Sequence, residues 1–155
     1  MARTQGAELN CPSHDAKHNE SDQPYILIVD DDEVFIEDLM SIWNPPLPVY
    51  IARSGAAFTE VLELRVSPIL IILDVDLPHF FSEVDYEEGL AILRYIRERI
   101  SSTMPVIIAS HFSAPEIKDR AMKLGAQKYF TKPFSVSDLE EAVIDLLKPA
   151  TPVSD

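Results

Sequence analysis

The chain has 155 residues, of which 46% are hydrophobic and 25% charged, a composition typical of one globular domain and too apolar for a disordered chain. With 13 basic and 26 acidic residues its formal net charge is −13, which argues against nucleic acid or an anionic membrane surface as a partner. The one cysteine, Cys11, excludes an intrachain disulfide, and no apolar run is long enough for a membrane span or a signal peptide. We therefore expect a cytoplasmic protein.

Short apolar runs alternate with amphipathic stretches from residue 25 onward. The apolar runs predict strands over residues 25–29, 49–52, 69–73, 106–109 and 128–131. Apolar residues at helical spacing predict helices over residues 34–43, 54–65, 90–100, 113–124 and 135–147. Five strand–helix repeats require right-handed crossovers, so we expect an α/β fold with a parallel sheet and helices on both faces. The polar segments 1–23 and 149–155 are expected to be tails, the first of them flexible.

Capping residues mark several of the predicted helix ends. Ser54 and Ser113 are expected to be N-caps of the second and fourth helices. Gly125 is expected to end the fourth helix, because glycine readily adopts the left-handed conformation found there. Ser135-x-x-Asp138 resembles a capping box at the start of the last helix.

Polar side chains follow four of the five predicted strands. Asp30 and Asp31 follow the first strand, Asp74 the third, Ser110 the fourth and Lys132 the fifth. Ligand sites in parallel α/β sheets lie at the carboxyl ends of the strands, so we expect these side chains to converge. Taken singly, each residue could be a helix cap, a turn residue or a surface lysine. Their common position is what indicates a site.

This combination of groups suits phosphoryl transfer. Neighbouring carboxylates raise one another's pKa unless a cation lies among them, and a hard divalent cation such as Mg²⁺ takes oxygen ligands. Lys132 adds a fixed positive charge and Ser110 a hydroxyl group. A metal ion, an ammonium and a hydroxyl around a carboxylate can stabilise the negative charge of a transferring phosphoryl group. The carboxylate would then be the nucleophile and would form an aspartyl phosphate.

Four segments occur in order at the ends of the first, third, fourth and fifth predicted strands: ILIVDDDE, LDVDLP, PVIIAS and YFTKPF. They resemble the motifs of response-regulator receiver domains of two-component signalling. The resemblance implies a flavodoxin-like, doubly wound (βα)5 sheet of five parallel strands in the order 2-1-3-4-5. It covers nearly the whole chain, so we expect a stand-alone receiver domain at residues 24–148.

The resemblance also implies a role for each acidic residue of the site. Asp74 would be the phosphoacceptor, taking a phosphoryl group from a histidine kinase or a histidine phosphotransfer protein. Asp31 would bind Mg²⁺ directly, Asp30 directly or through water, and Asp76 through its backbone carbonyl. Such a domain catalyses its own phosphorylation and dephosphorylation without being a conventional turnover enzyme. It would signal to a downstream protein as a monomer or weak homodimer.

The remaining implied roles concern the switch. Lys132 would pair with the phosphoryl oxygens, and the peptide bond to Pro133 is often cis in this family. Ser110 would follow the phosphoryl group, and Tyr129 would be the switch aromatic whose ring turns inward as Ser110 moves. His111 stands where the family usually has a small residue, so it would narrow access for the phosphodonor or tune the site.

The segment after the phosphoacceptor is longer than in the family, because Gly89 follows Asp74 by 15 residues. Residues 79–88 contain three aromatic residues among acidic ones, and we expect them to be mobile and to lie beside the site. Three interpretations remain open: a tolerated insertion, a cover that restricts water, or a docking element. We favour the cover, because three aromatics exceed what a solvated loop requires.

Other functions remain open at this stage. A pseudo-receiver would keep the fold as a binding module without being switched by phosphate, although the complete set of acids speaks against it. An Mg²⁺-dependent phosphatase would use a second aspartate two residues after its nucleophile, and the segment DVD at 74–76 supplies that spacing. In the N-terminal tail, Cys11, His14 and His18 have a spacing that could bind zinc, but a fourth ligand is not evident.

Overall fold

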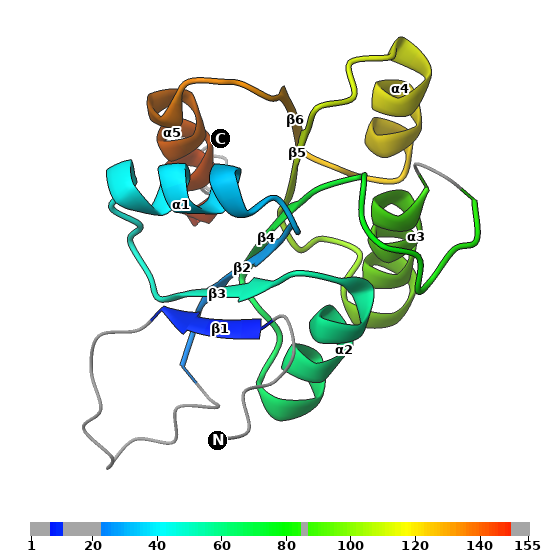
Figure 1. Ribbon diagram of the computed structural model, residues 1–155. Coiled ribbons are helices and arrows are strands. Elements are labelled where there is room, and N and C mark those ends of the chain that lie inside the picture. Colours follow the sequence, from blue (N-terminus) through cyan, green and yellow to red (C-terminus); the bar gives the residue numbers. More distant parts are fainter. Residues whose placement is uncertain (1–6, 11–22, 85–86, 150–155) are drawn as a thin grey trace, which may run out of the picture.

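The structure, a computed structural model, describes residues 7–10, 23–84 and 87–149. One sheet lies at its centre (Figure 1). Its strands are β1 (Ala7–Asn10), β2 (Ile26–Val29), β3 (Val49–Ala52), β4 (Leu70–Leu73), β5 (Val106–Ser110) and β6 (Lys128–Thr131). They lie in the order β1-β3-β2-β4-β5-β6, and β2 to β6 are parallel. The predicted order 2-1-3-4-5 of five parallel strands is therefore confirmed.

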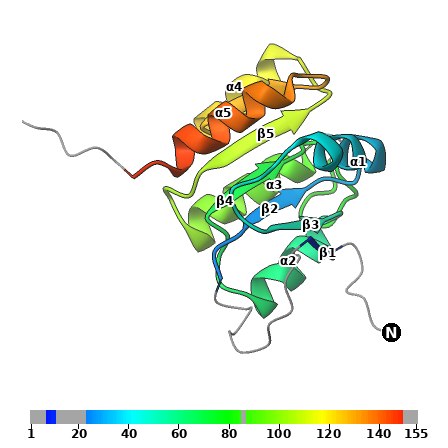
Figure 2. The same cartoon turned by 90° about the vertical axis from the view of Figure 1, so that its left-hand side faces the viewer.

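Helices cover both faces of the sheet, as expected from the strand–helix alternation (Figures 1 and 2). One face carries α1 (Glu33–Ile42) and α5 (Val136–Leu147). The other face carries α2 (Gly55–Leu64), α3 (Glu88–Tyr95) and α4 (Pro115–Lys123). A π-helical segment, η2 (Ile96–Ile100), continues α3. No helix of the described segments is long and apolar enough to cross a bilayer.

Two apolar layers hold the helices to the sheet. Successive side chains of a strand point to opposite faces, so each strand contributes to both layers. In β2, Leu27 and Val29 pack with α2 and α3, whereas Ile26 and Ile28 pack with α1 and α5. All four residues of β2, β3 and β4 are buried. Continuous burial of this kind is the reason that these strands are apolar throughout.

The sheet contains one strand that the sequence analysis did not predict. Residues 7–10 were expected to belong to the tail, but they form β1, which pairs antiparallel with β3, Ala7 opposite Ala52 and Asn10 opposite Val49. Without β1, the backbone N–H and C=O groups on the outer side of β3 would form an open sheet edge, and β1 satisfies them. Residues 1–6 and 11–22 lie outside the described residues, so the expected flexibility of the tail stays a prediction.

Two of the predicted helix ends are confirmed. Ser54 caps α2, because its hydroxyl accepts a hydrogen bond from the Ala57 N–H at 3.1 Å. Gly125 follows α4 with φ +102°, a conformation that favours glycine.

Two other capping predictions are wrong. The N-cap of α4 is Ala114 rather than Ser113, because Pro115 occupies the first helical position, where its fixed φ suits the helix. Ser135 is the N-cap of α5, but its side chain makes no cap hydrogen bond. Its hydroxyl lies 2.7 Å from that of Ser137 instead, so the predicted capping box does not form.

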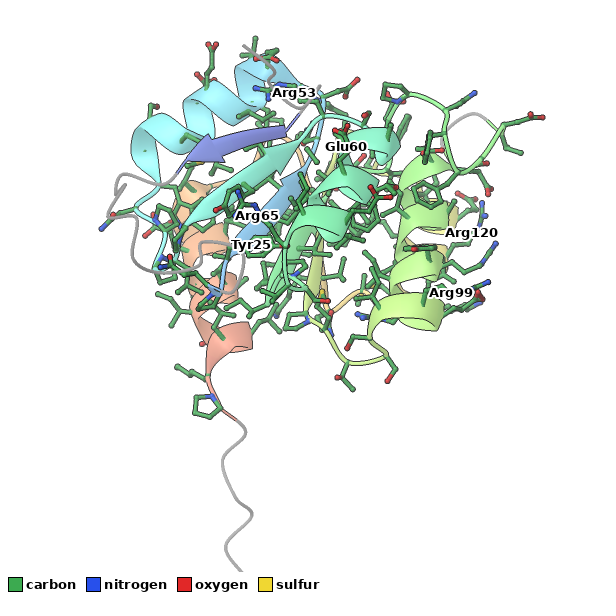
Figure 3. The ribbon with its side chains drawn as sticks, turned by 90° about the horizontal axis from the view of Figure 1, so that it is seen from below. Tyr25, Arg53, Glu60, Arg65, Arg99 and Arg120 are labelled. Atoms are coloured by element: carbon green, nitrogen blue, oxygen red, sulfur yellow. The ribbon has the colours of Figure 1, made fainter. Side chains whose placement is uncertain are left out.

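The edge of the sheet opposite the strand carboxyl ends is fastened by polar contacts. The buried Tyr25 hydroxyl donates to the Val66 carbonyl at 2.6 Å, and burial raises the pKa of Tyr25 to about 12. Arg65 lies beside Tyr25 (Figure 3), with its guanidinium 4.0 Å from the centre of the Tyr50 ring. These contacts hold the end of α2 against the sheet. The candidate site residues lie at the opposite edge, where the strands have their carboxyl ends.

Candidate functional site

The strand register brings the predicted site residues together. Val29 and Leu73 are direct partners in β2 and β4, so Asp30 and Asp74 follow neighbouring strands at the same level. The Asp74 N–H donates to the Val29 carbonyl at 2.9 Å. At the ends of β5 and β6, the Lys132 N–H donates to the Ser110 carbonyl at 2.8 Å. The convergence expected from the topology rule is therefore present in the structure.

Three carboxylates form an acidic cluster at this edge. Among the described residues, Asp30, Asp31 and Asp74 each offer an oxygen, and these oxygens lie within 4.8 Å of one another. Asp30 and Asp74 are buried, with exposed fractions of 1% and 4%, whereas Asp31 is exposed. Asp76 is also exposed, and its N–H donates to Asp74 Oδ1 at 3.2 Å. An all-oxygen donor set of this kind suits a hard divalent cation.

Lys132 supplies the positive charge that faces this cluster. Its Nζ lies 2.8 Å from Asp30 Oδ2, 3.4 Å from Asp74 Oδ2 and 3.7 Å from Asp32 Oδ2. It also lies 4.0 Å from the centre of the Phe35 ring. Burial opposes the charged form of this lysine, but Asp74 and Asp30 outweigh burial and raise its pKa. The Lys132–Pro133 peptide bond is cis, as the resemblance implied.

The acidic cluster carries more negative charge than Lys132 balances. Burial, and then the charge of Asp74, raises the pKa of Asp30 to about 7 in spite of the nearby ammonium. Burial and Asp74 also raise the pKa of Asp31. Like charges held this close favour the binding of either a proton or a metal cation. The cluster therefore fits Mg²⁺ both in its donor atoms and in its charge.

Asp32 turns away from the acidic cluster and caps α1. Its Oδ1 accepts a hydrogen bond from the Phe35 N–H at 3.1 Å, and its Oδ2 lies 3.2 Å from His111 Nε2. Burial opposes its ionisation, but the hydrogen bonds from Phe35 and His111 prevail and lower the pKa of Asp32. Sequence reasoning did not find the contact between Asp32 and His111, because the two residues are 79 positions apart.

The two expected switch residues meet at one residue of the loop between β5 and α4. The buried Ser110 hydroxyl accepts a hydrogen bond from the Phe112 N–H at 3.2 Å. The Tyr129 hydroxyl donates to the Phe112 carbonyl at 2.6 Å. Burial raises the pKa of Tyr129, although a hydrogen bond with Ser110 opposes this. Phe112 is therefore hydrogen-bonded to both expected switch residues, through its N–H to Ser110 and through its carbonyl to Tyr129.

The inserted segment contacts two helices through Phe81. The ring of Phe81 lies 6.1 Å from that of Phe58 on α2 and 5.3 Å from that of Tyr95 on α3. The neighbouring Phe80 is 57% exposed. Phe81 thus fills apolar space between α2 and α3, and a role of the segment as a cover stays a prediction. Residues 85 and 86, the latter the third aromatic, lie outside the described part of the chain.

Glu88 holds this segment in place, a role that sequence reasoning did not find. Its carboxylate is 1% exposed and accepts hydrogen bonds from the Phe81 and Ser82 N–H groups, each at 2.9 Å. The following residue, Gly89, donates to the Val75 carbonyl at 3.0 Å. A Cβ atom on Gly89 would collide with the Asp74 carbonyl oxygen, so this close approach requires glycine.

Three comparisons place this site among known proteins. The sequence profile described as "Response regulator receiver domain" matches residues 26–144. The chain is 32% identical over 124 residues to the TorCAD operon transcriptional regulatory protein TorR of Escherichia coli (strain K12), an alignment that covers 79% of the chain and 50% of TorR. The chain thus spans about half the length of the curated relatives that it matches.

Solved structures show the same fold. A CheY-like response regulator receiver domain protein from Methanospirillum hungatei JF-1 superposes with a TM-score of 0.65 at 25% identity, covering 79% of this chain and 91% of that one. The signal receiver domain of a signal transduction histidine kinase from Syntrophus aciditrophicus superposes with a TM-score of 0.62 at 28% identity, covering 85% and 98%. The Cys11, His14 and His18 pattern cannot be compared with the fold, since it lies outside the described residues.

Proposed function

The chain belongs to the response-regulator receiver domain family, and on that premise we propose that it accepts a phosphoryl group on Asp74. The donor would be a phosphohistidine of a histidine kinase or a histidine phosphotransfer protein. One observation carries the proposal: the Asp74 carboxylate lies 3.4 Å from Lys132 Nζ and belongs to the acidic cluster with Asp30 and Asp31.

The contacts of Asp74 suit it to be the nucleophile. Its Oδ1 is held by the Asp76 N–H, and its Oδ2 faces Lys132. A carboxylate oxygen would attack the phosphorus atom, forming the O–P bond while the N–P bond of the phosphohistidine breaks. The Lys132 ammonium would stabilise the charge on the peripheral phosphoryl oxygens. Mg²⁺, held by Asp30, Asp31, Asp74 and the Asp76 carbonyl, would supply the positive charge that these carboxylates and the phosphoryl group need.

The hydrogen bonds at Phe112 support a switch that follows phosphorylation. We propose that the Ser110 hydroxyl leaves the Phe112 N–H to bind a phosphoryl oxygen, and that Tyr129 responds through the Phe112 carbonyl. The surface formed by α4, β6 and α5 would change with it and would be read by a downstream protein. The domain would catalyse both its phosphorylation and its dephosphorylation.

Labelling with a small phosphodonor tests the proposal. The protein is incubated with phosphoramidate and Mg²⁺, and the modified residue is mapped by mass spectrometry after trapping. We expect modification at Asp74, its loss in Asp74→Asn, and its retention in the matched control Asp76→Asn. Labelling that persists in Asp74→Asn would refute the assignment. Absence of labelling in a folded protein that binds Mg²⁺ would favour a pseudo-receiver.

A further inference from the structure

An ion pair joins the inserted segment to α4. Glu87, the last residue before α3, pairs with Arg120 in the last turn of α4. Figure 3 shows Arg120 at the surface beside α3. The hydrogen bond from Arg120 is the main cause that lowers the pKa of Glu87, and the charge of Arg94 adds to it. The pair therefore connects the segment that follows Asp74 to the helix that follows Ser110.

The Glu87 end of this pair is fixed with respect to Asp74. Its neighbour Glu88 is buried and holds the Phe81 and Ser82 N–H groups. Gly89 then packs directly against the backbone of Asp74. Through these contacts Glu87 keeps its position relative to the phosphoacceptor even if α4 moves.

The Arg120 end belongs to α4, the helix that follows the switch residue Ser110 after a short loop. Strand β5 ends at Ser110, and α4 begins at Pro115, so only four residues separate the hydroxyl from the helix. Under the proposed function, Ser110 moves toward the phosphoryl group and leaves the Phe112 N–H to which it is now bonded. A shift of this short loop moves the start of α4, and the pair of Arg120 with Glu87 resists that movement.

We infer that Glu87 and Arg120 are positioning residues that hold α4, and with it the loop that follows Ser110, in the arrangement that precedes phosphorylation. This inference rests on the proposed function of Asp74 and concerns the regulation of that same site. The insertion is then more than a passive loop, since it places a carboxylate where α4 can be held.

The size of the effect follows from the exposure of the two side chains. The Arg120 side chain is 45% exposed and that of Glu87 is 27% exposed, so solvent screens much of their attraction. Partly exposed pairs of this kind shift an equilibrium by about two- to fivefold. A bias of this size tunes a two-state switch without locking it.

The test uses four variants of the whole chain and two measurements. Glu87→Gln and Arg120→Gln break the pair, and the double variant Glu87→Arg with Arg120→Glu restores it with reversed charges. Glu83→Gln is the matched control, because it removes one charge from the same segment at an exposed residue. The measurements are hydrogen exchange of the α4 amides without phosphodonor, and the initial rate of Asp74 labelling by phosphoramidate with Mg²⁺.

We expect both single variants to raise α4 exchange and the labelling rate about two- to fivefold. The charge-reversed variant should return both toward wild type, the control should change neither, and 1 M NaCl should abolish the differences. Unchanged α4 exchange in Glu87→Gln would overturn the inference. Faster exchange of the α4 amides with an unaltered rate of Asp74 labelling would also overturn the inference, but it would leave the proposed function intact. Failure of the wild type to label at Asp74 would instead refute the proposed function, and the positioning role with it.

Discussion

Replacing Asp30 by asparagine tests the electrostatics of the site most directly. Asp30 is 1% exposed, and burial together with Asp74 raises its pKa from 3.8 to about 7. Asparagine keeps the shape and an oxygen that can still accept the hydrogen bond of the Asp32 N–H, but it cannot ionise. The variant thus removes the charge while leaving the packing at the end of β2 nearly unchanged.

The sign of the effect follows from the raised pKa. Between pH 4 and pH 7 the folded protein keeps a proton on Asp30 that the unfolded chain has lost, so the free energy of unfolding falls as pH rises. A shift of about 3 pKa units at 1.36 kcal/mol each gives a loss of about 4 kcal/mol, complete above pH 7. Asparagine abolishes this loss but leaves Lys132 without one acceptor, which costs about 1–3 kcal/mol. At pH 8 we expect the variant to be the more stable protein.

Urea unfolding in EDTA at five pH values from 4 to 8 measures this difference. The gap in unfolding free energy between variant and wild type should change by about 3–4 kcal/mol over that range, in favour of the variant at high pH. Asp32→Asn is the matched control. The pKa of Asp32 is lowered in the folded protein, the opposite direction to that of Asp30, so its ionisation adds stability as pH rises from below pH 4 and does not remove it.

A pH-independent gap between Asp30→Asn and the wild type would refute the reasoning. It would mean that Asp30 is ionised throughout and that Lys132 alone compensates the cluster. Mg²⁺ provides a second check, because a cation that binds only the folded state stabilises it by mass action. Mg²⁺ added at pH 8 should raise the stability of the wild type more than that of the variant.

Three further outcomes are expected. In a metal titration, Asp31→Ala should lower the Mg²⁺ affinity at least tenfold, whereas Asp32→Ala should change it little. Equal losses in the two variants would mean that the assignment of the metal ligand is wrong by one position. Gly89→Ala should lower the free energy of unfolding by about 1–3 kcal/mol in urea, because its Cβ collides with the Asp74 carbonyl; an unchanged midpoint would contradict that contact. Ser54→Ala should cost about 1 kcal/mol by removing the α2 cap, and thermal unfolding should show it unless another group replaces the hydroxyl.

Much of the fold and of the site was predictable because both depend on patterns that the sequence displays. Runs of apolar residues predicted the buried strands, and the ends of four of the five runs predicted the positions of Asp30, Asp74, Ser110 and Lys132. The rule for parallel sheets then brought these ends together without any knowledge of side-chain contacts. Asp30, Asp31 and Asp74 were found in this way, and the structure gathers them as expected.

The features that sequence reasoning missed depend on contacts that no periodic pattern reports. Strand β1 is as short as β2, β3 and β4, but its sequence AELN lacks the continuous apolar run that predicted those strands. The partners of Glu88 are backbone N–H groups, which every sequence offers, so its burial left no signal. Ser113 carried a real capping preference, but the fixed φ of Pro115 set the start of α4 instead.

The register between β2 and β4 makes assembly of the site inseparable from folding. Val29 and Leu73 are opposite one another, so the residue after each delivers a carboxylate to the same point in space. A slip by one residue would turn every side chain of the strand to the other face, where it would no longer fit the apolar layer into which it packs. The free energy that forbids the slip comes from the buried layers and not from the acids, which repel one another. Packing of the hydrophobic core therefore sets the positions of the site residues. A partly folded chain has no assembled site that could bind a metal ion.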